Sequence, residues 1–542
     1  MRRLFRHRGL LLLASGVLLV AAACAPDPAT PEYWVKALQS AKRPQERVRV
    51  LDELRKSSHL TPALLPALHA QLGEQKAPEV KAALARTLAK LKDASSVEPL
   101  ASAVNWNATD SSAHRLNTDL AAALGDIGDA KAAPTLVRLL KSADNFVRLQ
   151  AMSSLGTIRA PEAVQPLLEV AQNPREEAMV AGRAIVALGE IGDARTVGTL
   201  VRLLFEERGP ARGRTSLYEP ASFALYRMGK PSADALLPVL AGDDAGLSKW
   251  ASKHDVSAGA LYAKSAQVLG YLLDKRAEPA LLSRLSYESA DEREKYFVRL
   301  TAADALGRLR SEAAAKPLSQ MLGEPELMIR DSYLRALSRI GHASVLPSLA
   351  STVAIGPFEA RSQVVSALGF LGQGAQTELL KKEAALETDR THKECAEVGN
   401  EGPCKKLDDL VKRRLDVFER AIAQTETAAR CATDAACWAK ALTDANPGVK
   451  ARAALEVGRR GQAGAVEQLV RLMSDPLRDV RLAALISADW LSETDAGLKP
   501  LRAGRQTLEA LLAADKGKSE YVEPSEDLRR LIAKANRGAK AN

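Results

Sequence analysis

A repeat of about 31 residues constrains the fold of this chain more than any other feature of its sequence. Within residues 124–171 the segment LGDIGDAKAAPTLVRLL is followed by LGTIRAPEAVQPLLEV, and the two Leu-Gly pairs lie 31 residues apart. A sequence that repeats in this way over most of residues 45–495 predicts an array of one structural unit. The pattern V-R-x-x-A-x-x-A-L-G-x-I-G recurs, in clear or degenerate form, from Val80, Leu116, Val147, Val180, Leu217, Leu261, Val298, Ile329, Ala360, Val449 and Val480.

Each copy has the periodicity of a helical hairpin. The apolar residues of one copy recur every three or four positions, on one face of an α-helix, as in Val147, Ala151, Leu155 and Ile158. A Gly near the end of such a helix, for example Gly128, suits a left-handed C-cap. A second short amphipathic segment follows and is often opened by Pro. One hairpin cannot bury its apolar face alone, so the units are expected to stack.

Composition agrees with a helical fold and argues against one class of partner. Only 4% of the residues are aromatic, which favours closely packed helices over a β-rich core. Four Arg in the first eight residues supply part of the net charge of +10, and the remaining 72 basic residues exceed the 66 acidic ones by only 6. Because these charges are interspersed instead of forming a stripe, we expect no nucleic-acid partner.

The repeated hairpins resemble HEAT repeats, in particular the short HEAT-like variety of phycobilisome lyases and many bacterial proteins. The resemblance implies an all-α fold, a right-handed α-solenoid of stacked HEAT-like helical hairpins over residues 45–373 and 446–495. The family consensus also has a basic residue after the first apolar position. It is present as Arg148, Arg299, Arg330, Arg361, Lys450 and Arg481. These residues either form a basic ladder for an anionic partner or, as we favour, cap or pair with the neighbouring repeat.

The N-terminus has the pattern of an export signal. A basic start is followed by an apolar run at residues 9–20 and by small residues before a possible cleavage site. The run is too short and too close to the start to be a spanning helix. We predict a lipoprotein signal peptide over residues 1–23 and a tether over residues 24–44, which contains APDPATPE.

The segment VAAAC resembles a bacterial lipobox, in which cleavage precedes a Cys that is then lipid-modified. Cys24 would be that residue, whereas a plain signal peptide cut after Ala23 would leave it as a thiol. Ala25 stands where Asp would favour the inner membrane, so the resemblance favours the outer membrane. The expected location is the bacterial cell envelope, with the chain lipid-anchored and facing the periplasm or exposed at the surface.

Four interruptions of the repeat predict a binding surface. They lie at residues 102–115, 205–220, 241–260 and 286–297, and we place them between the first and second helices of their repeats. Equivalent loops of successive repeats lie side by side, and Arg and aromatic residues are typical of binding hot spots. The alternative is that such loops are tolerated because closure entropy grows slowly with length. The predicted partner-binding ridge presents Trp106, Arg208, Arg212, Arg214, Tyr218, Trp250, His254, Tyr287 and Tyr296.

Residues 374–445 form a Cys-bearing helical insertion within the repeats. In an exported protein, four Cys in one segment indicate two disulfides, whose pairing the sequence leaves open among three options. We favour the local pairing, Cys395 with Cys404 and Cys431 with Cys437. A zinc site is the alternative, although the spacings do not match short C-x2–4-C knuckles. The helical run that begins near residue 405 is expected to supply an additional repeat.

The sequence contains no recognisable catalytic motif. It has no Ser nucleophile elbow, phosphate-binding loop or HExxH helix. The deoxyhypusine hydroxylase branch of HEAT-like proteins binds a di-iron centre through paired His-Glu motifs, but none of the seven His is followed by Glu here. The lyase branch acts on bilins, and no trace of a tetrapyrrole site is present. The loop carboxylates Asp243, Asp244 and Asp255 beside His254 are best interpreted as solvated loop charge.

These observations predict a non-enzymatic, membrane-anchored scaffold that binds another protein in the bacterial cell envelope. The alternative is a lyase-like or cofactor-binding HEAT-repeat enzyme. We expect no cofactor and no metal, a protein partner of unknown identity, a membrane contact through the lipid anchor, and a monomer. Residues 496–542 are expected to form a C-terminal helical cap and basic tail.

Overall fold

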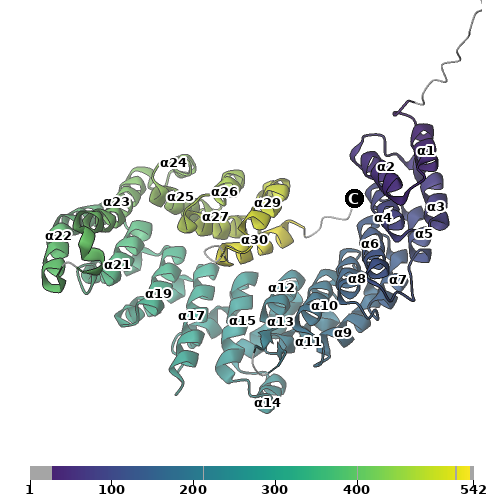
Figure 1. Cartoon of the computed structure of the whole chain (residues 1–542). Helices are drawn as coiled ribbons and strands as arrows, with labels where there is room; N and C mark the ends of the chain where they lie inside the picture. Colours follow the sequence, from purple (N-terminus) through teal and green to yellow (C-terminus); the bar gives the residue numbers. More distant parts are fainter. Residues whose placement is uncertain (1–26, 211–212, 400, 519–521, 537–542) are drawn as a thin grey trace, which may run out of the picture. The chain divides into compact units, whose positions relative to one another are not determined.

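The computed structural model of the chain is 78% helical and confirms the all-α solenoid (Figure 1). It describes residues 27–210, 213–399, 401–518 and 522–536. The chain divides into two units, residues 1–154 and 155–542, and the boundary falls within helix α8 (Asn145–Thr157). Among the described residues, no helix combines the length and the apolar character that crossing a bilayer requires. Cys24 and the predicted signal peptide lie outside the described residues.

The first helices of the hairpins stack on one another in each unit. In the first unit they are α2 (Pro44–Lys56), α4 (Pro78–Leu91) and α6 (Ser111–Ile127). In the second unit they are α10 (Ala178–Ile191), α12 (Tyr218–Met228), α15 (Ala258–Leu272), α17 (Glu292–Leu309), α19 (Leu327–Ile340), α21 (Phe358–Leu371), α23 (Leu407–Cys431), α25 (Pro447–Arg459) and α27 (Arg478–Leu491).

The second helices are mostly shorter. In the first unit they are α3 (Leu65–Glu74), α5 (Val97–Ser102) and α7 (Ala133–Leu139). In the second unit they are α9 (Val164–Gln172), α11 (Val197–Leu203), α13 (Lys230–Ala241), α16 (Glu278–Arg284), α18 (Ala315–Gln320), α20 (Leu346–Thr352), α22 (Gly374–Val398), α24 (Ala435–Ala441), α26 (Val466–Leu472) and α28 (Asp495–Ala503). Helix α8, which spans the boundary between the units and is followed by α9, and the helices α1 (Pro31–Ser40), α14 (Ala245–Lys253), α29 (Arg505–Asp515) and α30 (Val522–Ala535) complete the set of described helices.

The turn inside a hairpin follows from a Gly-Asp pair. Gly128 ends α6 at φ 80°, in the left-handed region that Gly adopts without strain. The carboxylate of Asp129 then accepts a hydrogen bond of 2.8 Å from the backbone N–H of Lys131 and opens a short 3₁₀ turn before α7. The same pair recurs as Gly192 and Asp193 between α10 and α11. This turn is compact, so longer insertions fall elsewhere.

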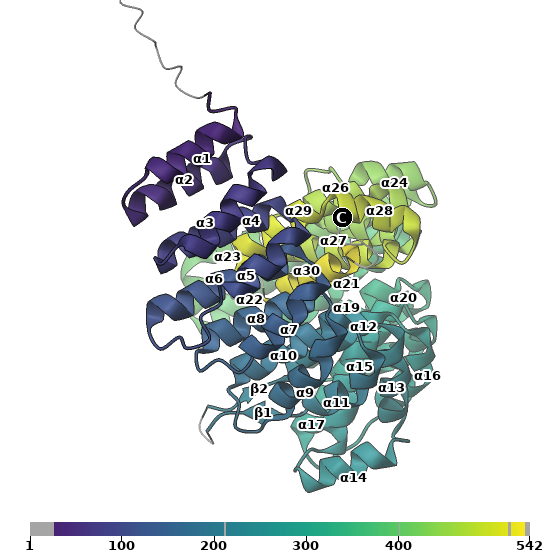
Figure 2. The ribbon, with the colours of Figure 1, turned by 90° about the vertical axis from the view of Figure 1, so that its right-hand side faces the viewer.

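The four longer loops therefore lie where the prediction did not place them. Each connects the second helix of one repeat to the first helix of the next, for instance between α11 and α12. That loop contains the antiparallel strands β1 (Glu207–Arg208) and β2 (Thr215–Ser216), which Figure 2 shows near α9 and α11. The loop at 241–260 contains α14. The predicted tether also differs from the structure, because residues 31–40 within it form α1.

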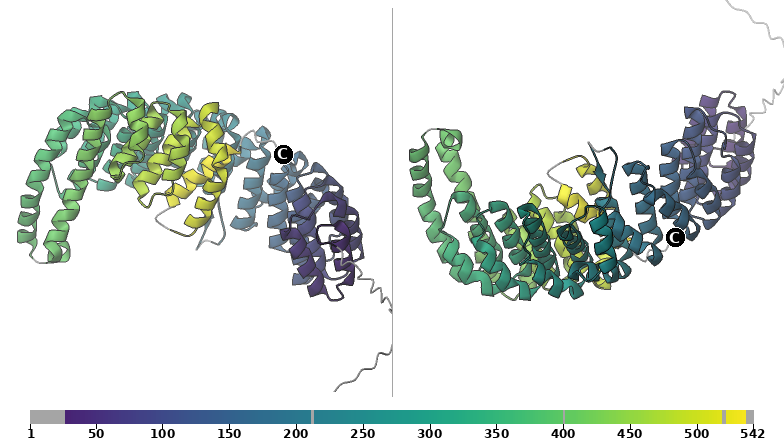
Figure 3. Two further views of the ribbon diagram at one scale, coloured as in Figure 1. Left: turned by 90° about the horizontal axis from the view of Figure 1, so that it is seen from above. Right: turned by 90° about the horizontal axis from the view of Figure 1, so that it is seen from below.

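The Cys-bearing segment consists of elongated repeat helices. Helices α22 and α23 each have 25 residues, against 14 in α21, and Figure 3 shows them side by side. Disulfides join Cys395 to Cys404 and Cys431 to Cys437, which is the local pairing. Helices α23 and α24 supply the expected additional repeat.

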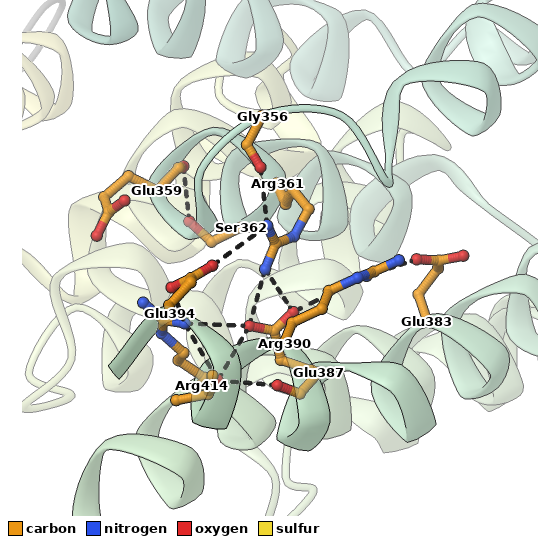
Figure 4. Close-up of polar contacts among 10 residues, drawn as sticks. Gly356, Glu359, Arg361, Ser362, Glu383, Glu387, Arg390, Glu394 and Arg414 are labelled. Carbon is orange, nitrogen blue, oxygen red and sulfur yellow. Dashed lines mark hydrogen bonds and ion pairs between the residues drawn. The ribbon is translucent and has the colours of Figure 1, made fainter. Parts of the chain in front are cut away.

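A buried ionic network, which we call the hairpin cluster, holds α21, α22 and α23 together (Figure 4). The carboxylate of Glu387 is 1% exposed and accepts hydrogen bonds from Arg361, at 2.6 Å, and from Arg414, at 3.4 Å. Arg414 also binds Glu394 at 2.6 Å. The three acids balance the three bases, as a buried network requires. Its members are Arg361, Glu383, Glu387, Arg390, Glu394 and Arg414.

The C-terminal helices of the second unit return to its early repeats. Helix α30 packs on α27 and also contacts α12 (Figure 1). The indole N–H of Trp490 in α27 donates to the backbone oxygen of Arg308 in α17 at 2.8 Å. Lys534 in α30 binds the carboxylate of Asp489 at 2.8 Å. Helices α27 and α30 therefore join the end of the array to helices far away in the sequence.

Candidate functional site

The structure places the predicted ridge residues in different environments. Trp106, in the first unit, is 39% exposed and lies under the guanidinium of Arg138, 3.8 Å from the ring centre. Arg208 is buried, pairs with Glu206 at 2.6 Å and donates to the backbone oxygen of Ala171. Its side chain, carried by strand β1, contacts α9 and does not lie on the predicted ridge.

The remaining ridge residues also make contacts that differ from one residue to the next. Tyr218 opens α12, and its hydroxyl donates to Gln267 in α15 at 2.7 Å, so it faces inward. Trp250 stacks on His254 with ring centres 4.5 Å apart. The hydroxyls of Tyr287 and Tyr296 donate to carboxylates of Glu294 and Glu324. Arg214 is exposed, and Arg212 lies outside the described residues.

The basic residue of the repeat consensus has a structural role. Nε of Arg148 donates to the backbone oxygen of Leu140, and Nε of Arg299 to that of Tyr287, so each caps the chain that leads into its own helix. Arg330 pairs with Gln363 of the next repeat, Lys450 with Asp475 and Arg481 with Asp515. These contacts support the capping interpretation, because the charges are used within the array.

A cavity of about 500 Å³ lies where α30 meets α10, α12 and α15. This volume is within the range of small-molecule sites in proteins. We call it the α30 cavity. Its lining residues are Met179, Gly182, Arg183, Val186, Tyr218, Glu219, Pro220, Ser222, Phe223, Tyr226, Tyr271, Glu526, Arg529 and Arg530.

A second ionic network, the closing cluster, lies beside the α30 cavity, and two of its members, Tyr271 and Arg530, line the cavity. It consists of Asp304, Arg308, Asp527 and Arg530 with the ring of Tyr271. Asp527 binds Arg530 at 2.5 Å and, 219 residues away in the sequence, Arg308 at 3.2 Å. The guanidinium of Arg530 lies 3.6 Å from the ring centre of Tyr271, within cation–π range. The network thus fixes α30 against α15 and α17.

The closing cluster controls ionisation at the cavity wall. Burial disfavours the charge on Asp527, but Arg308 and Arg530 hold the pKa of this carboxyl below its usual value. Burial raises the pKa of Tyr218 and of Tyr271, so both phenols stay neutral over a wide pH range.

Glu526 is the carboxyl with the most unusual environment in the α30 cavity. Burial raises its pKa above the usual value, Arg530 opposes this shift, and Glu219 adds to it. No hydrogen bond to its carboxyl group comes from the residues that the structure describes. A carboxyl that stays protonated at higher pH than usual can donate a proton or a hydrogen bond to a molecule in the cavity.

Sequence reasoning missed this site for a physical reason. Glu526 and Arg530 lie in a segment that has no repeat signal, and they meet Gly182 and Tyr218 more than 300 residues away in the chain. Whether these residues come together depends on the small rotation of each repeat relative to the preceding repeat, and no local sequence pattern specifies that rotation. The only available signal was the aromatic content of SLYEPASFALYRM, unusual in a chain with 4% aromatic residues.

The described residues do not fit the di-iron centre that the resemblance implied for one branch. They contain no group of three or more His, Cys, Asp or Glu placed to hold a metal ion. Their His side chains have other contacts, such as His69 with the hydroxyl of Ser96 and His342 with that of Ser344.

Comparison with protein families finds HEAT repeats at residues 110–179 and 436–516, and a PBS lyase HEAT-like repeat at residues 298–324. A human protein named deoxyhypusine hydroxylase is 28% identical over 254 residues, which cover 44% of this chain and 81% of that protein. The phycocyanobilin lyase subunit alpha of Picosynechococcus sp. is 33% identical over 118 residues, covering 19% of this chain and 43% of that protein.

Two solved structures align with this chain at low identity. Human deoxyhypusine hydroxylase in complex with glycerol aligns with 51% of this chain and 96% of its own, at 23% identity and a TM-score of 0.21. Yeast importin-beta (Kap95p) aligns with 90% of this chain and 69% of its own, at 12% identity and a TM-score of 0.45.

The comparisons overturn the predicted function, the prediction that the chain is not an enzyme, and the predicted location. The expectation of a non-enzymatic scaffold is wrong, because the curated relatives bear the names of enzymes, a hydroxylase and a lyase subunit. The lipid-anchored location in a bacterial cell envelope is contradicted as well, because the hydroxylase relatives are mammalian proteins. Motif reasoning failed because HEAT consensus residues are structural and carry no catalytic signature. The chain is an all-α solenoid that contains HEAT repeats, one of them of the PBS lyase HEAT-like kind.

Proposed function

We propose that this chain is a HEAT-repeat enzyme of the lyase-like or cofactor-binding type, with the α30 cavity as its site. The observation that carries the proposal is the presence, in one cavity of ligand size, of aromatic walls and a carboxyl with a raised pKa. Such a combination of a concave apolar site and a perturbed titratable group is typical of functional sites.

Glu526 is the residue that we expect to transfer the proton. Its carboxyl lines the cavity and is not engaged by another described side chain, whereas Tyr218 is tied to Gln267 and Arg530 to Asp527. A raised pKa brings a carboxylic acid closer to neutral pH, where general acid–base catalysis is most effective. Glu219 on α12 sits near enough to influence this carboxyl and would be the second acid–base group.

The names of the relatives support an enzyme without assigning its reaction. The hydroxylase relatives align over about four fifths of their own length, and the lyase subunit over less than half. The α30 cavity gives this chain a site of its own, built from helices that belong to its second unit.

Turnover of a metabolite mixture tests the proposal. The full chain is incubated with a protein-free cell extract, and substrate loss and product gain are followed by mass spectrometry. We expect conversion of at least one compound by the wild type and its loss in Glu526→Gln and in Gly182→Leu. Gly182 lines the cavity, where an added Cβ would meet only Pro220, at 3.4 Å, so the larger side chain should fill the site.

Gly198→Leu is the matched control, since Gly198 lies on the neighbouring helix α11 with open space around it. Its turnover should equal that of the wild type. The proposal is wrong if the wild type converts nothing, or if conversion survives in both Glu526→Gln and Gly182→Leu.

A further inference from the structure

Two guanidinium groups of the α30 cavity are available to a ligand. Arg183 projects from α10 and Arg529 from α30, and both line the cavity. In the part of the chain that the structure describes, neither has a hydrogen-bonded or ion-paired carboxylate. Two such groups, brought to one cavity from helices far apart in the sequence, provide the planar donors that bind a carboxylate.

The third guanidinium of the cavity is already compensated. Arg530 is held by Asp527 at 2.5 Å and by the ring of Tyr271. Burial raises the pKa of Glu526, and the nearby guanidinium groups of Arg530 and Arg529 oppose this shift. Glu219 and Glu526 are the two acids among the described lining residues, against Arg183, Arg529 and Arg530.

The rest of the wall is apolar or aromatic. Phe223 and Pro220 belong to α12, and Val186 and Met179 to α10. Met179 is 59% exposed, an unusual exposure for a large apolar side chain and one that a ligand would reduce. These side chains suit an aromatic or alkyl body, and the neutral phenols of Tyr218 and Tyr271 add polarisable ring faces.

We infer that the α30 cavity binds an organic carboxylate with an apolar body, with Arg183 and Arg529 on the carboxylate and Val186, Pro220 and Phe223 on the body. This inference rests on the proposed function only for the location of the site. It names the class of molecule on which that site acts.

Binding of simple probes tests the class directly. Titration calorimetry on the full chain compares 2-naphthoate, its neutral isostere 2-naphthamide, and inorganic phosphate. We expect 2-naphthoate to bind at least tenfold more tightly than 2-naphthamide, and phosphate not to compete with it. Arg183→Gln and Arg529→Gln should each weaken 2-naphthoate binding by about tenfold or more and leave 2-naphthamide unchanged. Arg202→Gln, an exposed Arg on α11 outside the cavity, should change neither.

Other outcomes separate the inference from the proposed function. Equal binding of the two naphthyl probes, no binding of 2-naphthoate, or full competition by phosphate would overturn the carboxylate class while turnover in the cell extract remained. Undiminished 2-naphthoate binding by Gly182→Leu would show that the probe sits elsewhere and would overturn the inference. A third outcome is that Glu526→Gln keeps full turnover while 2-naphthoate still binds and still depends on Arg183 and Arg529. That outcome would overturn only the catalytic role of the cavity.

Discussion

The hairpin cluster and the closing cluster use the same chemistry for different purposes. In the hairpin cluster, Arg361 and Glu387 lie 26 residues apart and join consecutive helices. In the closing cluster, Arg308 and Asp527 lie 219 residues apart and join α17 to α30. Both bury charges that are balanced nearly one to one. Two members of the closing cluster, Tyr271 and Arg530, also line a cavity.

The difference shows where function can arise in an array of repeats. Contacts between neighbouring repeats are repeated along the chain and mostly maintain the stack. A contact between remote repeats occurs once, and it can place groups such as Tyr271 and Glu526 together in a combination that no single repeat contains. The comparison can be tested by breaking each cluster in turn.

The largest effect is expected from Asp527→Asn. The change leaves Arg530 buried without an anion and removes one of the two partners of Arg308, and breaking a buried pair costs about 3–5 kcal/mol. It should also abolish 2-naphthoate binding, because α30 no longer holds its place. Urea unfolding and calorimetry provide the measurements. Asp234→Asn, which removes an exposed pair with Arg276, should cost no more than about 1 kcal/mol and spare binding. Equal losses in the two variants would show that the closing cluster does not hold α30.

A smaller loss is expected from Glu387→Gln. Arg361 and Arg414 lose their main anion, but Glu394 remains within 4 Å of both, so we expect a cost of about 2–3 kcal/mol, below the usual range for a broken buried pair. Binding of 2-naphthoate should be unchanged, which is the sharpest contrast with Asp527→Asn. Glu378→Gln, an exposed change on the same helix, is the control. A loss of probe binding in Glu387→Gln would mean that the two clusters are coupled.

Removal of the Cys395–Cys404 disulfide should act only on the end of the α22–α23 pair. The sequence separation of the two Cys is 9, and closing a loop of this size corresponds to about 2–3 kcal/mol in the chain-entropy model. In Cys395→Ser/Cys404→Ser we expect faster hydrogen exchange near residues 390–410 and unchanged exchange in α30. Faster exchange in α30 as well would contradict the local role of this disulfide.

The smallest effect should be the change in the free energy of unfolding between pH 7 and pH 4.5. In the folded chain, Arg339, Arg308 and Arg530 lower the pKa values of Asp304 and Asp527. The two carboxylates therefore make their full contribution to the free energy of unfolding at any pH above the pKa that they have in the unfolded chain. Stability should then fall as the pH drops through the folded pKa values. Unfolding free energies measured from pH 7 to pH 2 should show a shallower slope in Asp527→Asn than in the wild type. An equal slope would show that other groups dominate.

The sequence predicts the repeated part of this fold well. The spacing of Val147, Ala151 and Leu155 indicates a helix with one buried face, and all three are buried in α8. The Gly-Asp pair at Gly128 marks a turn because its backbone geometry is local. The pairing of Cys395 with Cys404 is also local, since nine positions along one chain limit the distance between them.

The sequence does not predict what the array brings together over long distances. Tyr218 was assigned to an exposed ridge because its loop is long, but its hydroxyl binds Gln267 and its ring lines the cavity. Asp527 and Arg530 were assigned only to a terminal cap. Their partners Arg308 and Tyr271 are specified by the accumulated rotation of the repeats in between, to which every helix packing angle contributes.

The return of α30 to α12 and α15 also sets an order of events during synthesis. Nearest-neighbour repeats can fold as they emerge from the ribosome, N-terminal ones first. The walls supplied by α10, α12 and α15 are therefore present early, while α30 begins 250 residues after the end of α15 and arrives last. Contacts of such long sequence separation form slowly. A nascent or truncated chain that lacks α30 would hold a stack of repeats without this cavity, and the appearance of probe binding would report that α30 has been made and has docked.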